Sequence, residues 1–285
     1  MDIAVHITFY YIESRLRYIN KILSNLSAIP HNISVFIYST KKLDFPSVFE
    51  NVEVKVIHFN FLNLRKGKRF LIGKRGLSRI PSVLRQYIHP YYLTWKNRKY
   101  VKRFIDQYDV QIYLEDDISF TNAAFNYWLK YKDMCMDYDY NLGFLRVEVD
   151  EDNNKLFCSD LTKTPERIIN IGNQLFLLND HNPYCGFWIY DKEELKKFTE
   201  SKEWYFKFKE YDIREKSAIG WHGLNMKRYK GTIIPLQVLE NNICVTHHEC
   251  KVHHLTNSYI GHSKVCRVEF PIQLKITTEN KVQDV

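Results

Sequence analysis

The feature that most constrains this chain is a short apolar segment that ends in three consecutive acids. Residues 110–120 read VQIYLEDDISF, so an apolar run is followed directly by Glu115, Asp116 and Asp117. The run has the length and the residue types of a strand buried in a sheet. Carboxylates resist burial unless they are paired or bind a metal, so we place the triplet at the carboxyl end of this strand and outside the core.

The triplet predicts a divalent cation site. Ligands of open α/β sheets bind just beyond the carboxyl ends of the strands, and carboxylate oxygens are hard ligands that suit Mg²⁺ or Mn²⁺. An acidic turn between a strand and a helix is the simpler interpretation of the triplet taken alone. The rest of the chain has to decide between the two.

The segments around the triplet alternate between strand and helix patterns. Residues 2–10 and 33–38 are rich in β-forming residues, and residues 52–59 alternate between apolar and polar. A helix is expected to begin at Glu13, with apolar residues at helical spacing from Leu16 to Leu26. This β-α-β-β opening predicts an α/β fold with a mixed, mostly parallel central sheet flanked by helices. Further along we expect a helix from His89 to Tyr108, with Arg98, Lys99, Lys102 and Arg103 on its polar face. We expect further helices at 121–136, capped by Thr121, at 192–199, begun by a capping box of Asp191 and Glu194, and from 214. Strands are expected at 142–147, 183–190, 231–238 and 243–246, and a strand or hairpin at 168–178.

Composition and length describe a globular chain that works inside a cell. The chain has 285 residues, of which 45% are hydrophobic, and no apolar run is long enough to span a membrane. The N-terminus MDIAVHITFYY lacks a basic leader and a cleavage site, so we expect a cytoplasmic protein. Six scattered cysteines without a CxxC pair indicate reduced thiols.

Positive charge is concentrated in one segment. Between Val54 and Ile105 there are 14 Lys and Arg residues and no acid, whereas the remaining chain has 27 basic and 33 acidic residues. Such a segment should contact phosphate, in a nucleic acid, an anionic membrane surface or a phosphorylated small molecule. Its first half, Asn63 to Pro81, contains glycines and lacks periodicity, which indicates a loop that includes the basic residues of 64–79.

A second concentration of polar residues lies in THHECKVHHLTNSY, residues 246–259. One interpretation is a zinc site, because Cys and neutral His are the ligands that zinc prefers. The candidate ligands form two closely spaced pairs, Cys244 with His247 and Cys250 with His253. Ordinary surface and core histidines are the second interpretation. The third is that His253 or His254 reaches the cation at the acidic triplet.

The α/β opening, the strand ending in Glu115-Asp116-Asp117 and the late histidines resemble the GT-A class of glycosyltransferases, over roughly residues 2–260. The resemblance implies one domain, residues 1–275, with a nucleotide-sugar half at about 1–120, an acceptor half at about 121–275 and a tail at 276–285. It implies that Mn²⁺ or Mg²⁺ bridges the diphosphate of a nucleotide sugar. A UDP-sugar is favoured over a GDP-sugar as the donor, and the acceptor is a glycan or a lipid-linked molecule.

The resemblance also assigns residues. Asp117 is the expected metal ligand, and His254 or His253 completes the shell. We expect the donor to be bound by Glu115, Asp116, Arg146, Arg98 and Thr40. An inverting enzyme also needs a carboxylate base for the acceptor hydroxyl. We expect Glu215 in that role, with Asp212 behind it and a helix cap or a solvent-facing acid as the alternatives.

Strand geometry favours His254 over His253. Adjacent residues of a strand point to opposite faces, so only one of the two can reach the metal. His253 shares a face with Leu255, whereas His254 shares a face with Thr256. We therefore expect an imidazole nitrogen of His254 within a few ångströms of the Asp117 carboxylate.

The basic segment has more than one interpretation. In a glycosyltransferase, residues 64–79 would close over the phosphates, or residues 64–103 would contact an anionic membrane at its inner face. A nucleotidyltransferase holding two metals is an alternative, but the segment after the first strand, YYIESRLRY, has no glycine. A nucleic-acid-binding protein using residues 55–103 is another, but we expect no nucleic acid because no such motif is present.

Overall fold

The structure is a computed structural model of the chain. The residues that it describes are 1–46, 49–61, 92–180, 182–205, 213–221, 232–262, 264–276 and 282–284. The loop predicted at 64–79 lies outside them.

The chain divides into two compact units, and neither is one continuous stretch of sequence. Unit 1 comprises Met1–Ile19, Pro30–Asp116 and Phe187–Ala218, and unit 2 comprises Asn20–Ile29, Asp117–Gly186 and Ile219–Val285. One boundary therefore falls inside the acidic triplet, between Asp116 and Asp117. The organisation into a single domain with a nucleotide-sugar half and an acceptor half stays a prediction.

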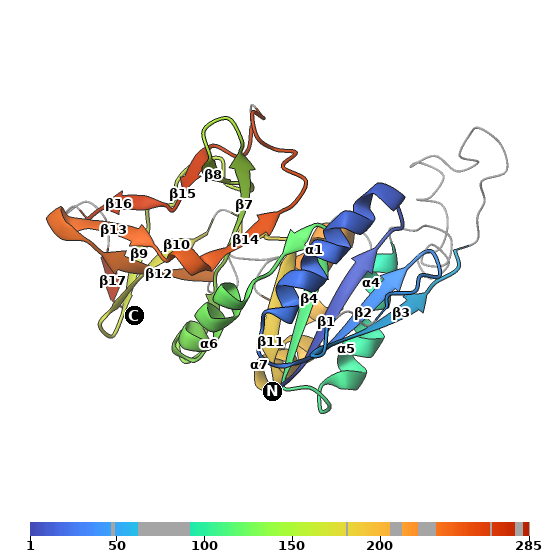
Figure 1. The fold of residues 1–285 in the computed structure, drawn as a ribbon. Coiled ribbons are helices and arrows are strands. Elements are labelled where there is room, and N and C mark those ends of the chain that lie inside the picture. Colours follow the sequence, from blue (N-terminus) through green and yellow to red (C-terminus); the bar gives the residue numbers. More distant parts are fainter. Residues whose placement is uncertain are drawn as a thin grey trace, which may run out of the picture. The chain divides into compact units, whose positions relative to one another are not determined.

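Unit 1 is built on a five-stranded sheet (Figure 1). Its strands in spatial order are β11 (Phe187–Asp191), β4 (Val110–Glu115), β1 (Asp2–Phe9), β2 (Asn32–Ser39) and β3 (Val52–His58). The last four run parallel and β11 runs antiparallel to β4. All six residues of β4 are buried, as in a strand covered on both faces. The acidic triplet was expected to lie outside the core, which is wrong, because Glu115, Asp116 and Asp117 are all buried. The predicted α/β class, with a mostly parallel sheet flanked by helices, is confirmed.

Aromatic side chains fill one face of this sheet. Phe36 and Tyr38 of β2 pack with Leu93 of α4 (Leu93–Lys96), and Phe104 of α5 (Arg98–Phe104) packs against the same cluster. His6 of β1 lies in this face, fully buried and stacked on the rings of Phe36 and Phe104. This packing places α4 and α5 against one side of the parallel strands.

The predicted helix to Tyr108 is shorter than expected and one of its basic residues is buried. The helix is interrupted at Asn97, and α5 ends at Phe104. Periodicity placed Arg98 on a solvent-facing basic side, which is wrong. Its guanidinium lies 4.0 Å from the ring centre of Trp95 and 4.3 Å from that of Trp204, and it donates to the Trp204 carbonyl at 3.0 Å. Burial lowers the pKa of Arg98 to about 9.

The other helices of unit 1 follow their sequence signals. Asp191 caps α7 (Lys192–Glu200), and with Glu194 it forms the expected capping box. Helix α8 spans Ile213–Ile219, and its last residue belongs to unit 2. Short 3-10 turns lie at Glu13–Arg15 and Lys202–Trp204. Helix α1, Leu16–Ser27, begins in unit 1 and continues into unit 2.

Unit 2 contains two further sheets. A seven-stranded sheet has the order β16-β13-β12-β10-β9-β17, with β6 paired to β12. Its strands are β16 (Gln273–Lys275), β13 (Ile243–Thr246), β12 (Thr232–Val238), β10 (Gln174–Asn179), β9 (Ile168–Ile171), β17 (Val282–Asp284) and β6 (Asn141–Leu142). The expected tail at 276–285 therefore contains a strand, β17, that pairs with β9.

A five-stranded sheet carries the residues that matter most for the site. Its order is β15-β8-β7-β14-β5. The strands are β15 (Val268–Phe270), β8 (Lys155–Cys158), β7 (Leu145–Asp150), β14 (Lys251–His254) and β5 (Ile118–Ser119). Sequence analysis gave no strand within 150–165, where β8 lies. Strand β14 carries His253 and His254, and it runs parallel to β7 and antiparallel to β5. Because β5 directly follows the acidic triplet, this pairing places the late histidines beside the residues after the triplet.

Helix α6, Asn122–Met136, also belongs to unit 2. The side chain of Thr121 accepts a hydrogen bond from the Ala124 amide at 3.3 Å, so the predicted cap is confirmed. Tyr127 of this helix donates its hydroxyl to the Gly143 carbonyl at 2.9 Å. Short 3-10 turns lie at Glu240–Asn242 and His248–Cys250.

The structure also places the cysteines and one tryptophan. All six cysteines are buried and free. Trp188 is buried and its ring stacks on the rings of Tyr113 and Tyr190. Within the described ranges, no helix is long and apolar enough to cross a membrane.

Candidate functional site

In unit 1, the first two acids of the triplet lie at the carboxyl end of the parallel strands. Glu115 is the last residue of β4, and in the sheet register it lies opposite Thr8 of β1. Asp116 accepts a hydrogen bond from the Arg15 guanidinium at 2.6 Å, which makes a partly buried ion pair. Strand β4 ends at Glu115, and Asp116 lies in the turn that follows it.

Thr40 lies at the same edge, directly after β2. Its hydroxyl accepts a hydrogen bond from the Tyr11 amide at 3.1 Å, and so ties the loop after β1 to the loop after β2. The ammonium group of Lys41 lies 4.1 Å from the centre of the Tyr11 ring. Thr40 and Asp116, two predicted donor-binding residues, therefore follow parallel strands at the edge where ligands of such sheets bind.

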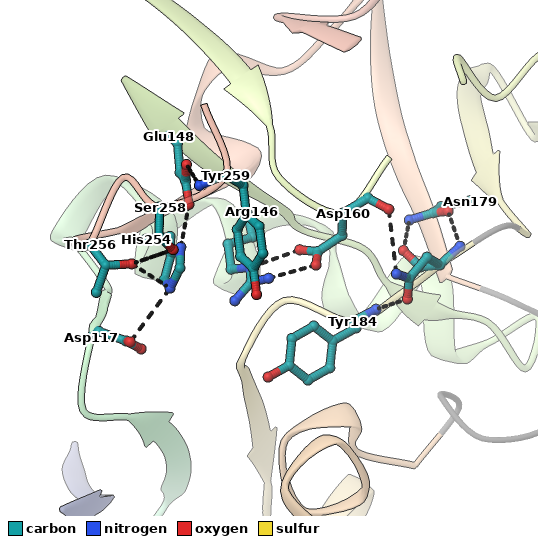
Figure 2. Close-up of polar contacts among 11 residues, drawn as sticks. Asp117, Arg146, Glu148, Asp160, Asn179, Tyr184, His254, Thr256, Ser258 and Tyr259 are labelled. Carbon is teal, nitrogen blue, oxygen red and sulfur yellow. Dashed lines mark hydrogen bonds and ion pairs between the residues drawn. The ribbon is translucent and has the colours of Figure 1, made fainter. Parts of the chain in front are cut away.

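In unit 2, Asp117 meets His254. The amide of Leu255 donates to the Asp117 carbonyl at 2.8 Å, which continues the pairing of β14 with β5. The Nε2 atom of His254 lies 3.5 Å from the Asp117 carboxylate (Figure 2). The predicted proximity is confirmed. The metal-binding role of the two residues is not tested by this geometry and stays a prediction.

Three more side chains fix the imidazole of His254. The Thr256 hydroxyl lies 2.9 Å from Nε2, and Nδ1 contacts the carboxylate of Glu148 on β7. The Tyr259 ring stacks on the imidazole with the ring centres 5.4 Å apart. We call Asp117, Glu148, His254, Thr256 and Tyr259 the His254 cluster (Figure 2).

The electrostatics of the cluster favour positive charge on its histidine. Burial alone would lower the pKa of His254, but hydrogen bonds to Asp117 and Glu148 outweigh burial, so its pKa is raised above the usual value. The other histidine of the pair behaves in the opposite way. Burial, together with the charges of Lys251 and other basic groups, lowers the pKa of His253 to about 4. Only His254 therefore sits where a positive charge is stabilised.

Arg146, a predicted donor-binding residue, lies on β7 next to the cluster. Its guanidinium forms an ion pair with Asp160. It donates two hydrogen bonds to the Asp160 carboxylate, at 2.8 and 2.6 Å. Burial raises the pKa of Asp160 although the ion pair opposes this effect. The guanidinium also lies 5.0 Å from the ring centre of Tyr184 and 5.4 Å from that of Tyr259. Figure 2 shows these groups beside the His254 cluster.

The zinc interpretation of the late run is not supported. Among the residues that the structure describes, no group of three or more His, Cys, Asp or Glu side chains could hold a metal. Cys244 donates its thiol to the Leu274 carbonyl at 3.5 Å, and His247 contacts Glu249. The chain spreads these side chains over several partners, and they do not converge on one point.

The structure describes only one of the two expected bases. Glu215 is an exposed residue of α8 in unit 1. Asp212 lies outside the described residues, as do the basic residues at 64–79. The roles of all three stay predictions.

Two residues that organise the cluster, Glu148 and Tyr259, were not predicted from the sequence. A signal for Glu148 was present, because Arg146 and Glu148 alternate with Leu145, Val147 and Val149 along one strand. Charged residues at every second position of an otherwise apolar strand indicate a polar face that needs internal partners. Which partners it finds depends on the pairing of β7 with β14, which no local pattern specifies.

Comparison with known proteins gives limited similarity. The chain is similar to S. aureus TarS 1–349 in complex with UDP-GlcNAc, at 13% identity and a TM-score of 0.37, over 69% of this chain and 47% of that one. It is similar to TarS 1–349 in complex with UDP at 12% identity and a TM-score of 0.40, over 76% and 53%. The chain thus spans about half the length of these TarS chains. No protein-family model and no curated protein matches the chain. Because these similarities are low, we infer the function from the chain's own residues.

Proposed function

We propose that this chain is a metal-dependent glycosyltransferase that moves a sugar from a nucleoside-diphosphate sugar to a glycan or lipid-linked acceptor. The single observation that carries the proposal is the placement of the His254 imidazole against the Asp117 carboxylate, at 3.5 Å, directly after a buried strand of the parallel sheet. Of the alternatives for the triplet, an acidic turn would leave the approach of a buried histidine unexplained.

The residues present fit a divalent cation of the Mn²⁺ or Mg²⁺ type. Such ions are usually held by one or two protein side chains, with phosphate oxygens and waters as the remaining ligands, so an all-protein cage is not needed. Asp117 and His254 would hold the ion through a carboxylate oxygen and Nε2. Imidazole is a ligand of transition metals more than of Mg²⁺, so the pair fits Mn²⁺ better. When bound, the ion would neutralise the charge on a departing diphosphate.

The chain's own residues supply the remaining parts of the proposal. Thr40, Glu115 and Asp116 lie at the edge of unit 1 where α/β sheets bind nucleotides, and we assign them to the donor. Glu215 is the proposed base that takes the proton from the acceptor hydroxyl, and its exposure on α8 leaves its carboxylate open to a ligand.

A titration of UDP with and without Mn²⁺ tests the proposal. We expect Mn²⁺ to tighten UDP binding at least about tenfold in the native chain, because an ion held by Asp117 and His254 would offset the negative charge of the phosphates. Asp117→Asn and His254→Ala should lose this enhancement while keeping native circular dichroism. Matched controls on the surface are Asp133→Asn on α6 and His262→Ala, both exposed.

Two outcomes would contradict the proposal. One is UDP binding that is equally strong with and without Mn²⁺ in the native chain. The other is an unchanged Mn²⁺ enhancement in a folded Asp117→Asn variant. A panel of sugar nucleotides, screened for hydrolysis with Mn²⁺ present, then identifies the donor sugar.

A further inference from the structure

The side chain that contacts Nδ1 of His254 is a fully buried carboxylate. Glu148 is 0% exposed, and its partners come from two other parts of unit 2. Its Oε2 atom accepts hydrogen bonds from the backbone amides of Tyr259, at 2.7 Å, and Ile260, at 3.0 Å. Its Oε1 atom contacts Nδ1 of His254 (Figure 2). Glu148 therefore joins β7, β14 and the loop after β14.

The basic residue on the same strand, Arg146, pairs with a different acid. Arg146 lies two positions before Glu148 and gives two hydrogen bonds to Asp160. His254 is therefore the side chain that offers a proton to Glu148. Because a carboxylate only accepts hydrogen bonds, the atom of His254 that faces it must be a protonated nitrogen.

We propose that Glu148 is a positioning residue that holds the proton of the neutral His254 ring on Nδ1, so that the Nε2 lone pair is left for a divalent cation beside Asp117. The inference rests on the proposed function for the identity of the ligand, but the tautomer that it predicts is a property of the metal-free protein. Metal-binding histidines are commonly fixed in this way by a carboxylate on the other ring nitrogen.

Once the ring is neutral, its contacts favour this tautomer. The Asp117 carboxylate also faces Nε2, but at 3.5 Å it is too far for a good hydrogen bond, whereas the Glu148 carboxylate contacts Nδ1 directly. The Thr256 hydroxyl lies 2.9 Å from Nε2 and can donate to a lone pair there, and it lies 3.2 Å from the Ser258 hydroxyl. A hydroxyl rotates at little cost, so Thr256 can donate a hydrogen bond to the Nε2 lone pair in the metal-free protein and turn away when a metal ion binds there. The stacked Tyr259 ring fixes the plane of the imidazole, and its amide is bound by the same Glu148.

One substitution reverses the tautomer without changing the size of the side chain. In Glu148→Gln the two amide donors at Tyr259 and Ile260 require an acceptor, so the Gln carbonyl oxygen must face them. The Gln amide nitrogen then faces Nδ1 of His254 as a donor, which moves the imidazole proton to Nε2. A protonated Nε2 cannot bind a metal. We expect Mn²⁺ affinity to fall by about 10- to 100-fold, the usual effect of removing such a partner.

The tautomer is measured first, by long-range ¹H–¹⁵N correlation on metal-free protein labelled with ¹⁵N-histidine. Spectra are recorded at a pH above which the His254 signals no longer move, and His254→Gln assigns those signals by their loss. The native chain should show the proton on Nδ1, and Glu148→Gln should show it on Nε2. Glu269→Gln, at an exposed acid on β15 of the same sheet, is the matched control and should keep the native spectrum.

Mn²⁺ titrations of the same proteins complete the test. A native chain with its proton on Nε2 overturns the inference, and so does a folded Glu148→Gln that keeps the proton on Nδ1. If Glu148→Gln does not fold, the native spectrum alone decides. A switched tautomer with unchanged Mn²⁺ affinity leaves the role of Glu148 intact but removes His254 as a ligand. Absence of Mn²⁺ binding in the native chain overturns the proposed function and not the tautomer.

Discussion

Acid should destabilise unit 1 through one buried histidine. The His6 ring is fully buried, with its Nε2 atom 2.9 Å from Gln111 Oε1 and its Nδ1 atom 2.8 Å from the Tyr38 hydroxyl. Gln111 donates its own amide to the Val101 carbonyl at 3.1 Å, so its oxygen is the atom turned to His6. The ring is thereby held neutral, with its proton on Nε2 and its Nδ1 accepting from Tyr38.

The structure sets the size and the sign of the effect. Burial lowers the pKa of His6 from 6.5 to about 4, partly offset by the Gln111 hydrogen bond. Between these two values the unfolded chain binds a proton that the folded chain does not, so the free energy of unfolding falls as the pH falls. Each pH unit of difference corresponds to about 1.36 kcal/mol, so His6 should cost about 3 kcal/mol of stability between pH 7 and pH 4.

Urea unfolding at pH 7, 5.5 and 4, followed by far-ultraviolet circular dichroism, measures this loss. In His6→Gln the titrating group is absent, so the decrease in unfolding free energy from pH 7 to pH 4 should be smaller by about 3 kcal/mol. His262→Gln, at an exposed histidine, should keep the native decrease. Equal decreases in the native chain and in His6→Gln, with equal m values, would refute the reasoning.

Two further substitutions test packing and capping. A Cβ at Gly143 would lie 2.7 Å from Cγ1 of Ile234, so Gly143→Ala should lower the free energy of unfolding by about 1–3 kcal/mol; an unchanged midpoint in urea would show that the strand shifts to make room. Asp191→Ala removes the capping box of α7 and should cost about 1 kcal/mol. Glu193→Ala in the same first turn is its control, and an equal loss in both variants would contradict a specific role for the cap.

Local sequence signals predicted the elements and half of the candidate site. The apolar run before Glu115 and the caps at Thr121 and Asp191 act over a few residues, and each is found in the structure. The resemblance to GT-A glycosyltransferases implied that a late histidine lies beside Asp117, and the alternation of faces along a strand then favoured His254 over His253.

Two contacts between distant residues were not predicted. Glu148 meets His254 because β7 and β14 pair in parallel with Val147 beside His253, and that register is set by the packing of the whole sheet. The burial of Arg98 has a similar cause. A helical wheel groups it with lysines, but the rings of Trp95 and Trp204 cover the guanidinium, which is weakly hydrated and stacks readily on aromatic faces.

The order of the strands in unit 1 has a consequence for synthesis on the ribosome. Strand β4 lies between β1 and β11, but β11 is encoded only after residues 116–186, most of which belong to unit 2. At roughly 5–20 residues per second, the nascent chain exposes the unpaired backbone of β4 for several seconds before β11 can add to it. Exposed strand edges are sites of aggregation, so this interval is when chaperones should matter most for this protein.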